Sequence, residues 1–91
     1  PRLEVRNRMF QEEGGVSRLE AELHNPTLAG LKDVVAEALL YDRAGNVVAA
    51  SQTVLPELAP QSAVPLRFVW QRVFPEEPAR IEVFYQVPPV N

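Results

Sequence analysis

Apolar and polar residues alternate along most of this chain, in stretches of about ten residues that are separated by Pro, Gly or Asn. Between residues 16 and 25, for example, Leu19, Ala21 and Leu23 share one parity, and charged residues fill much of the other. Alternation with period two is typical of β-strands that bury one face. It predicts six strands, at residues 2–10, 16–25, 33–42, 46–54, 63–71 and 79–87.

The parity also predicts which side chains face the core. In the first strand, Asn7 interrupts an inward set made of Leu3, Val5 and Met9, so we expect a bulge or a sheet edge at that position. The inward positions expected in the later strands are Leu19, Ala21, Leu23, Val34, Ala36, Ala38, Leu40, Val64, Leu66, Phe68, Trp70, Ile81, Val83, Tyr85 and Val87.

One segment, residues 31–40, is rich in Ala, Leu and Glu and could also form a helix. We favour a strand because a hairpin signal follows directly. The Asp42 side chain can accept a hydrogen bond from a backbone N–H two residues on, and Gly45 suits the left-handed position that ends a three-residue hairpin loop.

Prolines and glycines mark the connections. Glu12 to Gly15 is expected to form a turn, and Pro65 indicates that its strand begins at a sheet edge. Leu58 lies between Pro56 and Pro60 and is expected to plug one end of the core. Together these features predict an all-β protein, an antiparallel immunoglobulin-like β-sandwich of about six to seven strands.

The composition excludes several classes of function. The chain has 91 residues, which fits a single domain over residues 1–91, and it begins at Pro1, as expected for a domain excised from a longer protein. It contains no Cys and one His, so thiol catalysis and a two-histidine metal site are excluded. The net charge of −3 is opposite to that of a nucleic-acid-binding surface.

The central segments resemble a known family. The runs Ala38-Leu39-Leu40-Tyr41-Asp42 and Gly45-Asn46-Val47-Val48, with Leu58-Ala59-Pro60, Leu66-Arg67-Phe68 and an Asn after the second strand, are similar to FxLYD-type domains. These are small immunoglobulin-like modules of bacterial and archaeal envelope and secreted proteins. The resemblance covers roughly residues 16–70, but Ala38 replaces the Phe of the motif and Gln61 a usual Gly. It implies the fold, an extracytoplasmic location and structural roles for the motif, with no activity.

The chemically reactive residues have structural interpretations. His24 is expected to be a solvated residue at a strand end, and no Ser lies in a nucleophile elbow. The acidic pairs Glu12-Glu13 and Glu76-Glu77 are expected to be solvated loop charges rather than a calcium site. Glu37 is expected to pair with an Arg on a neighbouring strand. Cross-strand ion pairs are expected among Arg2, Arg6, Arg8, Arg18, Glu4, Glu20 and Glu22.

An apolar outer face is the more informative candidate. If the third, fifth and last strands shared a sheet, its outer face would gather Val35, Leu39, Tyr41, Val69 and Phe84. A contiguous apolar patch usually marks a contact with another domain or subunit. The alternative is that a loop of the same domain covers this face, such as the loop holding Phe74.

These observations predict a non-catalytic structural or protein-interaction module of a larger envelope or secreted protein, without a cofactor. The expected partners are other domains of the parent protein, another protein or a second copy; nucleic acid and direct membrane insertion of this segment are not expected. A cytoplasmic location stays open. Two alternatives remain: a small protease inhibitor that uses the Pro-rich loop at residues 73–78, and a fragment of an enzyme whose catalytic residues lie on another domain.

Overall fold

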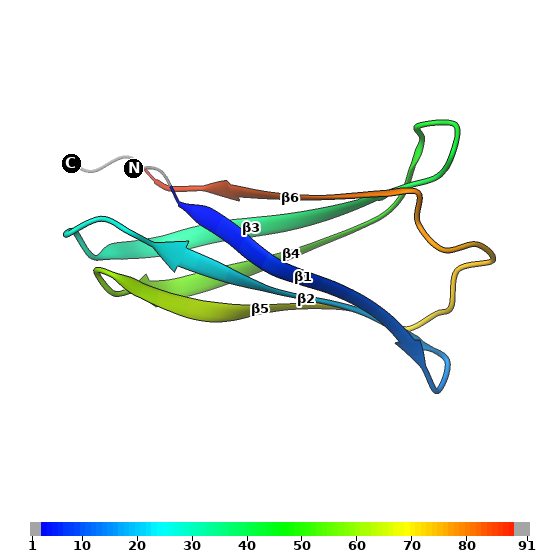
Figure 1. The fold of residues 1–91 in the computed structure, drawn as a ribbon, viewed down its shortest axis with the longest axis horizontal. Helices are drawn as coiled ribbons and strands as arrows, with labels where there is room; N and C mark the ends of the chain where they lie inside the picture. Colours follow the sequence, from blue (N-terminus) through cyan, green and yellow to red (C-terminus); the bar gives the residue numbers. More distant parts are fainter. Residues whose placement is uncertain (1–2, 89–91) are drawn as a thin grey trace.

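The computed structural model describes residues 3–88, which form a β-sandwich of two antiparallel three-stranded sheets (Figure 1). The predicted all-β sandwich is therefore confirmed, and the helix considered for residues 31–40 is a strand. The described residues contain no helix that could cross a membrane. The strands are β1 (Glu4–Glu13), β2 (Val16–Asn25), β3 (Leu31–Tyr41), β4 (Val47–Leu58), β5 (Ser62–Trp70) and β6 (Arg80–Gln86).

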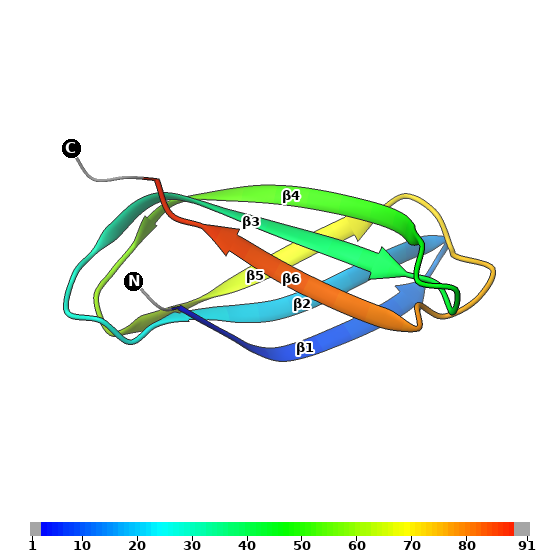
Figure 2. The same cartoon turned by 90° about the horizontal axis from the view of Figure 1, so that it is seen from above.

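The two sheets have the strand orders β1-β2-β5 and β4-β3-β6. In the stacked sheets, β6 lies on the same side as β1, and β4 lies on the same side as β5 (Figure 2). Hydrogen bonds join the sheets along both sides. On one side the Leu3 N–H donates to the Tyr85 hydroxyl at 3.1 Å, and on the other the Trp70 indole N–H donates to the Ala50 carbonyl at 3.1 Å.

The core lies between the sheets and is built from the predicted inward faces. Val34, Ala36, Ala38 and Leu40 of β3 are all 0% exposed, as the alternating pattern requires. Trp70 and the inward side chains of β6 are partly buried against this core. The other buried apolar side chains are Leu3, Leu19, Ala21, Leu23, Leu31, Leu58, Leu66, Phe68 and Phe74.

A bulge in β1 confirms the predicted interruption but overturns one inward residue. Asn7 has a φ of 56°, and the pairing of β1 with β2 shifts between Arg6 and Met9. A bulge adds one residue to one strand, so the parity of the residues after it is reversed. Met9 is consequently 55% exposed, and Phe10 packs against the core instead.

The two prolines within strands, Pro56 and Pro65, lie on edge strands, where a missing N–H breaks no ladder hydrogen bond. Pro65 is on β5, which is an edge as predicted. Strand β4 is longer than predicted and continues through Pro56 to Leu58, because β3 already begins at Leu31 and pairs with this extension. Leu58 is 1% exposed at the end of the core, which confirms its predicted position as a plug.

The turn predicted at Glu12 to Gly15 is shorter than expected, because Glu12 and Glu13 belong to strand β1 and are not loop residues. Gly14 and Gly15, with φ values of 62° and 80°, form the two-residue connection between β1 and β2. In the connection between β3 and β4, one Asp42 carboxylate oxygen accepts hydrogen bonds from the Ala44 and Asn46 N–H groups, both at 2.9 Å. Gly45 has a φ of 85°, as the left-handed position requires.

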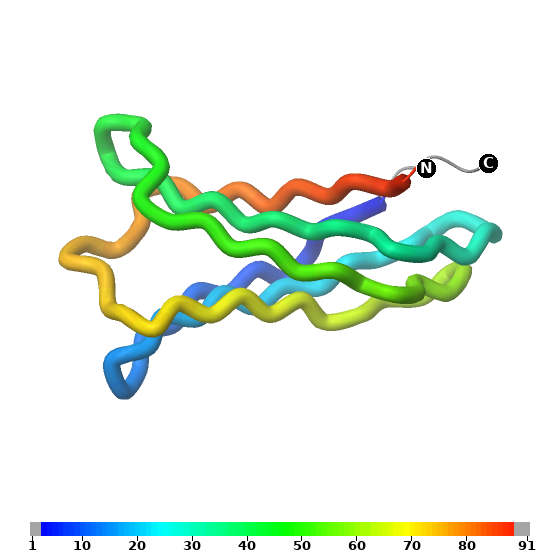
Figure 3. Tube along the Cα trace, turned by 180° about the vertical axis from the view of Figure 1, so that it is seen from behind, coloured from blue at the N-terminus to red at the C-terminus, as the bar shows by residue number. Residues whose placement is uncertain are grey.

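A buried polar residue closes the end of the sandwich opposite to the connection between β5 and β6. Asn25 is 0% exposed, and its amide donates to the carbonyls of Ala29 at 2.9 Å and Ala59 at 3.2 Å. Its oxygen accepts from the backbone N–H and the hydroxyl of Thr27, at 3.0 and 2.6 Å. One side chain therefore ties the β2–β3 loop to the β4–β5 turn, and these two segments lie at the same end of the backbone trace (Figure 3).

Candidate functional site

The outer face of the β4-β3-β6 sheet is the candidate contact surface. Because the even-numbered residues of β3 from Val34 to Leu40 point into the core, the odd-numbered residues between and after them point outward. The strand register places partners from β4 and β6 on either side of each one. We define the outer face as Val35, Glu37, Leu39, Tyr41, Ala50, Gln52, Val54, Arg80, Glu82, Phe84 and Gln86.

Four of the five predicted contact residues lie together on this outer face: Val35, Leu39, Tyr41 and Phe84. Phe84 is 47% exposed, so a large aromatic surface is open to solvent. The assignment of Val69 to this face is wrong. Strand β5 pairs with β2 in the other sheet, and Val69 lies opposite Arg18 there.

Two apolar members of the outer face, Val54 and Ala50, were not predicted from the sequence. Val54 is 54% exposed and lies directly opposite Val35. The alternation along β4 marks this position, because Thr53 and Leu55 on either side of Val54 are more buried and point to the opposite face. Val54 and Val35 thus lie side by side in one cross-strand row, and Phe84 lies in the next row beside Glu37.

Two charged residues of the outer face, Arg80 and Glu82, lie next to Tyr41. The Arg80 guanidinium lies 4.0 Å from the centre of the Tyr41 ring and 3.9 Å from a Glu82 carboxylate oxygen. Hydrogen bonding to Glu82 and desolvation raise the pKa of the Tyr41 phenol, against the opposing effect of Arg80. Glu37 forms no ion pair within residues 3–88, and its register partners are Gln52 and Phe84, so the predicted Arg partner is wrong.

The outer face of the other sheet is mainly charged. The Arg6 guanidinium lies 3.5 Å from Glu22, its register partner, which confirms one predicted cross-strand ion pair. Glu20 has a guanidinium on either side, at 3.7 Å from Arg18 on its own strand and 3.9 Å from Arg67 across the sheet. The two sheets thus present different chemistry: charged residues dominate the outer face of the β1-β2-β5 sheet, and apolar side chains alternate with polar ones on that of the β4-β3-β6 sheet.

Other residues of this charged sheet that were singled out in the sequence do not form the predicted contacts. Arg8 donates to the Ile81 carbonyl at 2.9 Å, and Arg2 lies outside the described residues. His24 is less solvated than predicted, because its side chain is 24% exposed. Its Nδ1 is 3.6 Å from a Glu4 carboxylate oxygen, which is too long for a hydrogen bond.

The connection between β5 and β6 does not cover the contact surface. Phe74 is 5% exposed and lies between the sheets, with ring centroids 6.4 Å from Phe10 and 6.2 Å from Trp70. A Glu12 carboxylate oxygen accepts from the Phe74 N–H at 3.1 Å and from the Ser17 hydroxyl at 3.2 Å. The loop therefore closes one end of the sandwich, and the alternative that it covers the outer face is wrong.

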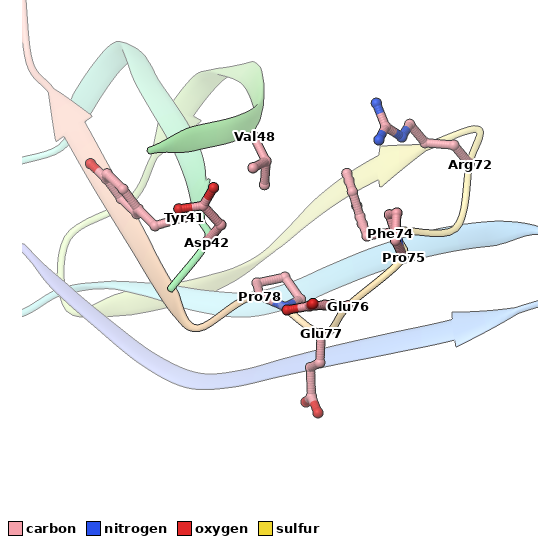
Figure 4. Close-up of a pocket in the computed structure, with 9 residues that line it drawn as sticks. All are labelled: Tyr41, Asp42, Val48, Arg72, Phe74, Pro75, Glu76, Glu77 and Pro78. Atoms are coloured by element: carbon pink, nitrogen blue, oxygen red, sulfur yellow. The ribbon is translucent and has the colours of Figure 1, made fainter. Parts of the chain in front are cut away.

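A pocket of about 360 Å³ lies beside this loop (Figure 4). Its polar groups are Tyr41, Asp42, Arg72, Glu76 and Glu77, and Glu77 points away from the others in the close-up. Its remaining lining residues are Val48, Phe74, Pro75 and Pro78.

Among the described residues, no three His, Asp or Glu side chains are grouped as a metal ion would need. The Asp42 carboxylate instead accepts hydrogen bonds from the backbone of the β3–β4 hairpin. Hydrogen bonds from Asn46, together with those from Ala44 and Gly45, lower the pKa of its carboxyl group.

Comparison with known proteins adds evidence on the fold. No family model and no curated protein sequence matches the chain. A solved structure, a DUF1425 family member from Shewanella sp. pv-4, superposes with a TM-score of 0.71 over 98% of this chain and 81% of that chain. The sequence identity is 16%, so the similarity supports the β-sandwich fold alone.

Proposed function

We propose that this chain is a non-catalytic, immunoglobulin-like module that works by protein contact through the outer face. The observation that carries the proposal is the apolar outer surface of the β4-β3-β6 sheet, which no described segment covers. Phe84 is 47% and Val54 54% exposed at its two edges, and exposed apolar side chains that gather on one face support a contact with another protein.

The strand order supports the immunoglobulin-like part of the proposal. In immunoglobulin variable-type domains, strands A, B and E share one sheet, and strands C′, C and F share the other. The orders β1-β2-β5 and β4-β3-β6 correspond to these sets in chain order. The resemblance to FxLYD-type domains further supports a place in an envelope or secreted protein, outside the cytoplasm.

Site-specific photocrosslinking tests the contact surface. A photoreactive phenylalanine analogue is introduced in place of Leu39, on the outer face, or in place of Val69, on the charged sheet, in the parent protein in its native cell. Protein adducts are expected from position 39 and not from position 69, and Leu39→Glu should abolish adducts from an analogue at position 84. Equal adducts from positions 39 and 69, or none from position 39, would contradict the proposal.

The protease-inhibitor alternative stays a prediction. The loop at residues 73–78 turns its Phe inward and leaves Pro75, Glu76 and Glu77 exposed. Inhibition of a panel of proteases by the isolated domain would support it. No inhibition at about micromolar concentration would remove it.

A further inference from the structure

The two sheets have four edge strands, namely β1 and β5 in one sheet and β4 and β6 in the other. An edge strand presents unpaired backbone N–H and C=O groups, and it recruits another strand unless something blocks it. Bulges, prolines and charged side chains are the usual obstacles. The four edges can therefore be compared for their ability to accept a further strand.

Three of the four edges carry an obstacle. Strand β1 has the bulge at Asn7, where φ is 56° and the pairing register shifts. Strand β5 contains Pro65, and strand β4 contains Pro56. A bulge bends a strand away from a straight neighbour, and a proline removes a donor that a new ladder would need.

Strand β6 contains neither a bulge nor a proline. Its seven residues, Arg80–Gln86, contain no Pro or Gly, and they pair with β3 without a register shift. Ile, Val, Phe and Tyr make up four of the seven, which is a composition that favours strand pairing. The Arg8 guanidinium contacts the backbone at one end of the strand, at the Ile81 carbonyl, and leaves the central residues uncapped by a described side chain.

We propose that the β6 edge pairs antiparallel with β6 of a second copy of this chain, about a two-fold axis at Val83. The inference goes beyond the proposed function, because it concerns the edge of the sheet and leaves the outer face uncovered. It would join the two β4-β3-β6 sheets into one continuous sheet of six strands, with both outer faces on the same side.

The sequence of β6 is self-complementary in this register. An axis at Val83 places Arg80 opposite Gln86, Ile81 opposite Tyr85, and Glu82 opposite Phe84. All seven residues then have a register partner, and no like charges are directly opposed, while the two Glu82 side chains become diagonal neighbours. The Ile81 carbonyl exchanges the Arg8 guanidinium for the Tyr85 N–H of the second copy. Moving the axis to Glu82 would oppose two carboxylates, which is unfavourable in a cross-strand pair. The two Phe84 rings become diagonal neighbours across the axis, within reach of each other, which accounts for an aromatic side chain left 47% exposed at an edge.

Light scattering after size exclusion tests the association, from about 1 μM to about 1 mM protein. The unmodified chain is expected to shift from monomer to dimer as the concentration rises. Phe84→Glu should remain monomeric throughout, because the new carboxylate would face Glu82 of the second copy. Val54→Glu is the matched control on the other edge of the same sheet, and it should dimerise like the unmodified chain. Far-ultraviolet circular dichroism establishes that both variants are folded.

Disulfide trapping tests the register. Because the chain contains no cysteine, every disulfide that forms must join the introduced residues. Glu82→Cys chains mixed with Phe84→Cys chains should form a disulfide-linked heterodimer, because directly opposed residues are close enough to bridge and diagonal ones are not. Each variant alone, or Phe84→Cys mixed with Val69→Cys, should give far less product.

The outcomes separate this inference from the proposed function. A monomer at all concentrations, a dimer that survives Phe84→Glu, or disulfides that ignore the 82–84 pairing would each overturn the β6 dimer. If the chain stays monomeric while photocrosslinking from position 39 yields adducts with other proteins, the contact module stands and the second copy is the wrong partner.

Discussion

Replacement of Asn25 by alanine should remove about 4 kcal/mol from the free energy of unfolding. The side chain is completely buried, and it forms two hydrogen bonds of 2.9 and 3.2 Å to the carbonyls of Ala29 and Ala59. It accepts two more from Thr27, at 3.0 and 2.6 Å. Alanine would leave these partners without the side chain that satisfies them.

The magnitude follows from these four hydrogen bonds. A buried hydrogen bond contributes roughly 1 kcal/mol net, and a partner left unsatisfied costs about the same or more. Four of them give about 4 kcal/mol, which is a large part of the roughly 5–15 kcal/mol that stabilises a typical domain. For a domain of this size the melting temperature should fall by about 15 °C or more.

Urea denaturation followed by fluorescence measures this loss. Trp70 is the one tryptophan in the chain, and its indole bonds to Ala50 of the other sheet, so its emission reports separation of the sheets. Asn46→Ala is the matched control, because Asn46 is exposed and its amide is 3.5 Å from Asp42. A loss below about 1 kcal/mol, or one equal to that of Asn46→Ala, would refute the proposed role of Asn25 in closing this end.

Three further predictions concern the opposite end and the hairpin. Phe74→Ala should cost about 3 kcal/mol by opening a cavity between the sheets, whereas Leu28→Ala, at a side chain 82% exposed, should change the unfolding free energy by less than about 0.5 kcal/mol. The lowered pKa of Asp42 means that its ionised form stabilises the fold above about pH 4, and that this effect is lost as the pH falls through the lowered value. The difference in melting temperature between the unmodified chain and Asp42→Ala should therefore shrink on acidification, and a constant difference would contradict the cause assigned to the shift. Gly45→Ala should destabilise the fold by about 1 kcal/mol or more because φ is 85°, and Gly30→Ala, which meets only ordinary contacts, should not.

The alternating pattern was sufficient to predict the sandwich because β2 and β3 each bury one face, and β4 and β5 mostly alternate between exposed and more buried positions. The strand at β3 was separable from a helix only through its neighbour, since Ala and Leu favour a helix locally and the Asp42–Gly45 turn requires a hairpin. Met9 was misplaced for a local reason as well. The alternation of inward and outward residues can be followed past a bulge only when the extra residue is located. Asn7 marked the position of the bulge in the sequence, but the sequence did not show that the residues after it change faces.

The candidate site depended on long-range pairing, which local patterns do not contain. Leu39 and Phe84 were correctly placed on one face because β3 and β6 pair. Val69 was not, because β5 pairs with β2 in the other sheet; both pairings join residues about forty to fifty positions apart, and the local pattern does not distinguish them. Asn25 looked like the end of a strand, and its burial becomes visible only when the β4–β5 turn meets the β2–β3 loop.

The even number of strands gives the domain a particular response to mechanical force. Strand β1 starts and β6 ends at the same end of the sandwich, where the Leu3 N–H bonds to the Tyr85 hydroxyl (Figure 1). Tension between these two points would peel β1 from β2 and β6 from β3 one pair at a time, rather than shear whole ladders at once. A domain pulled in this way yields at low force, so it suits a side-mounted contact module better than a link that bears tension along a fibre.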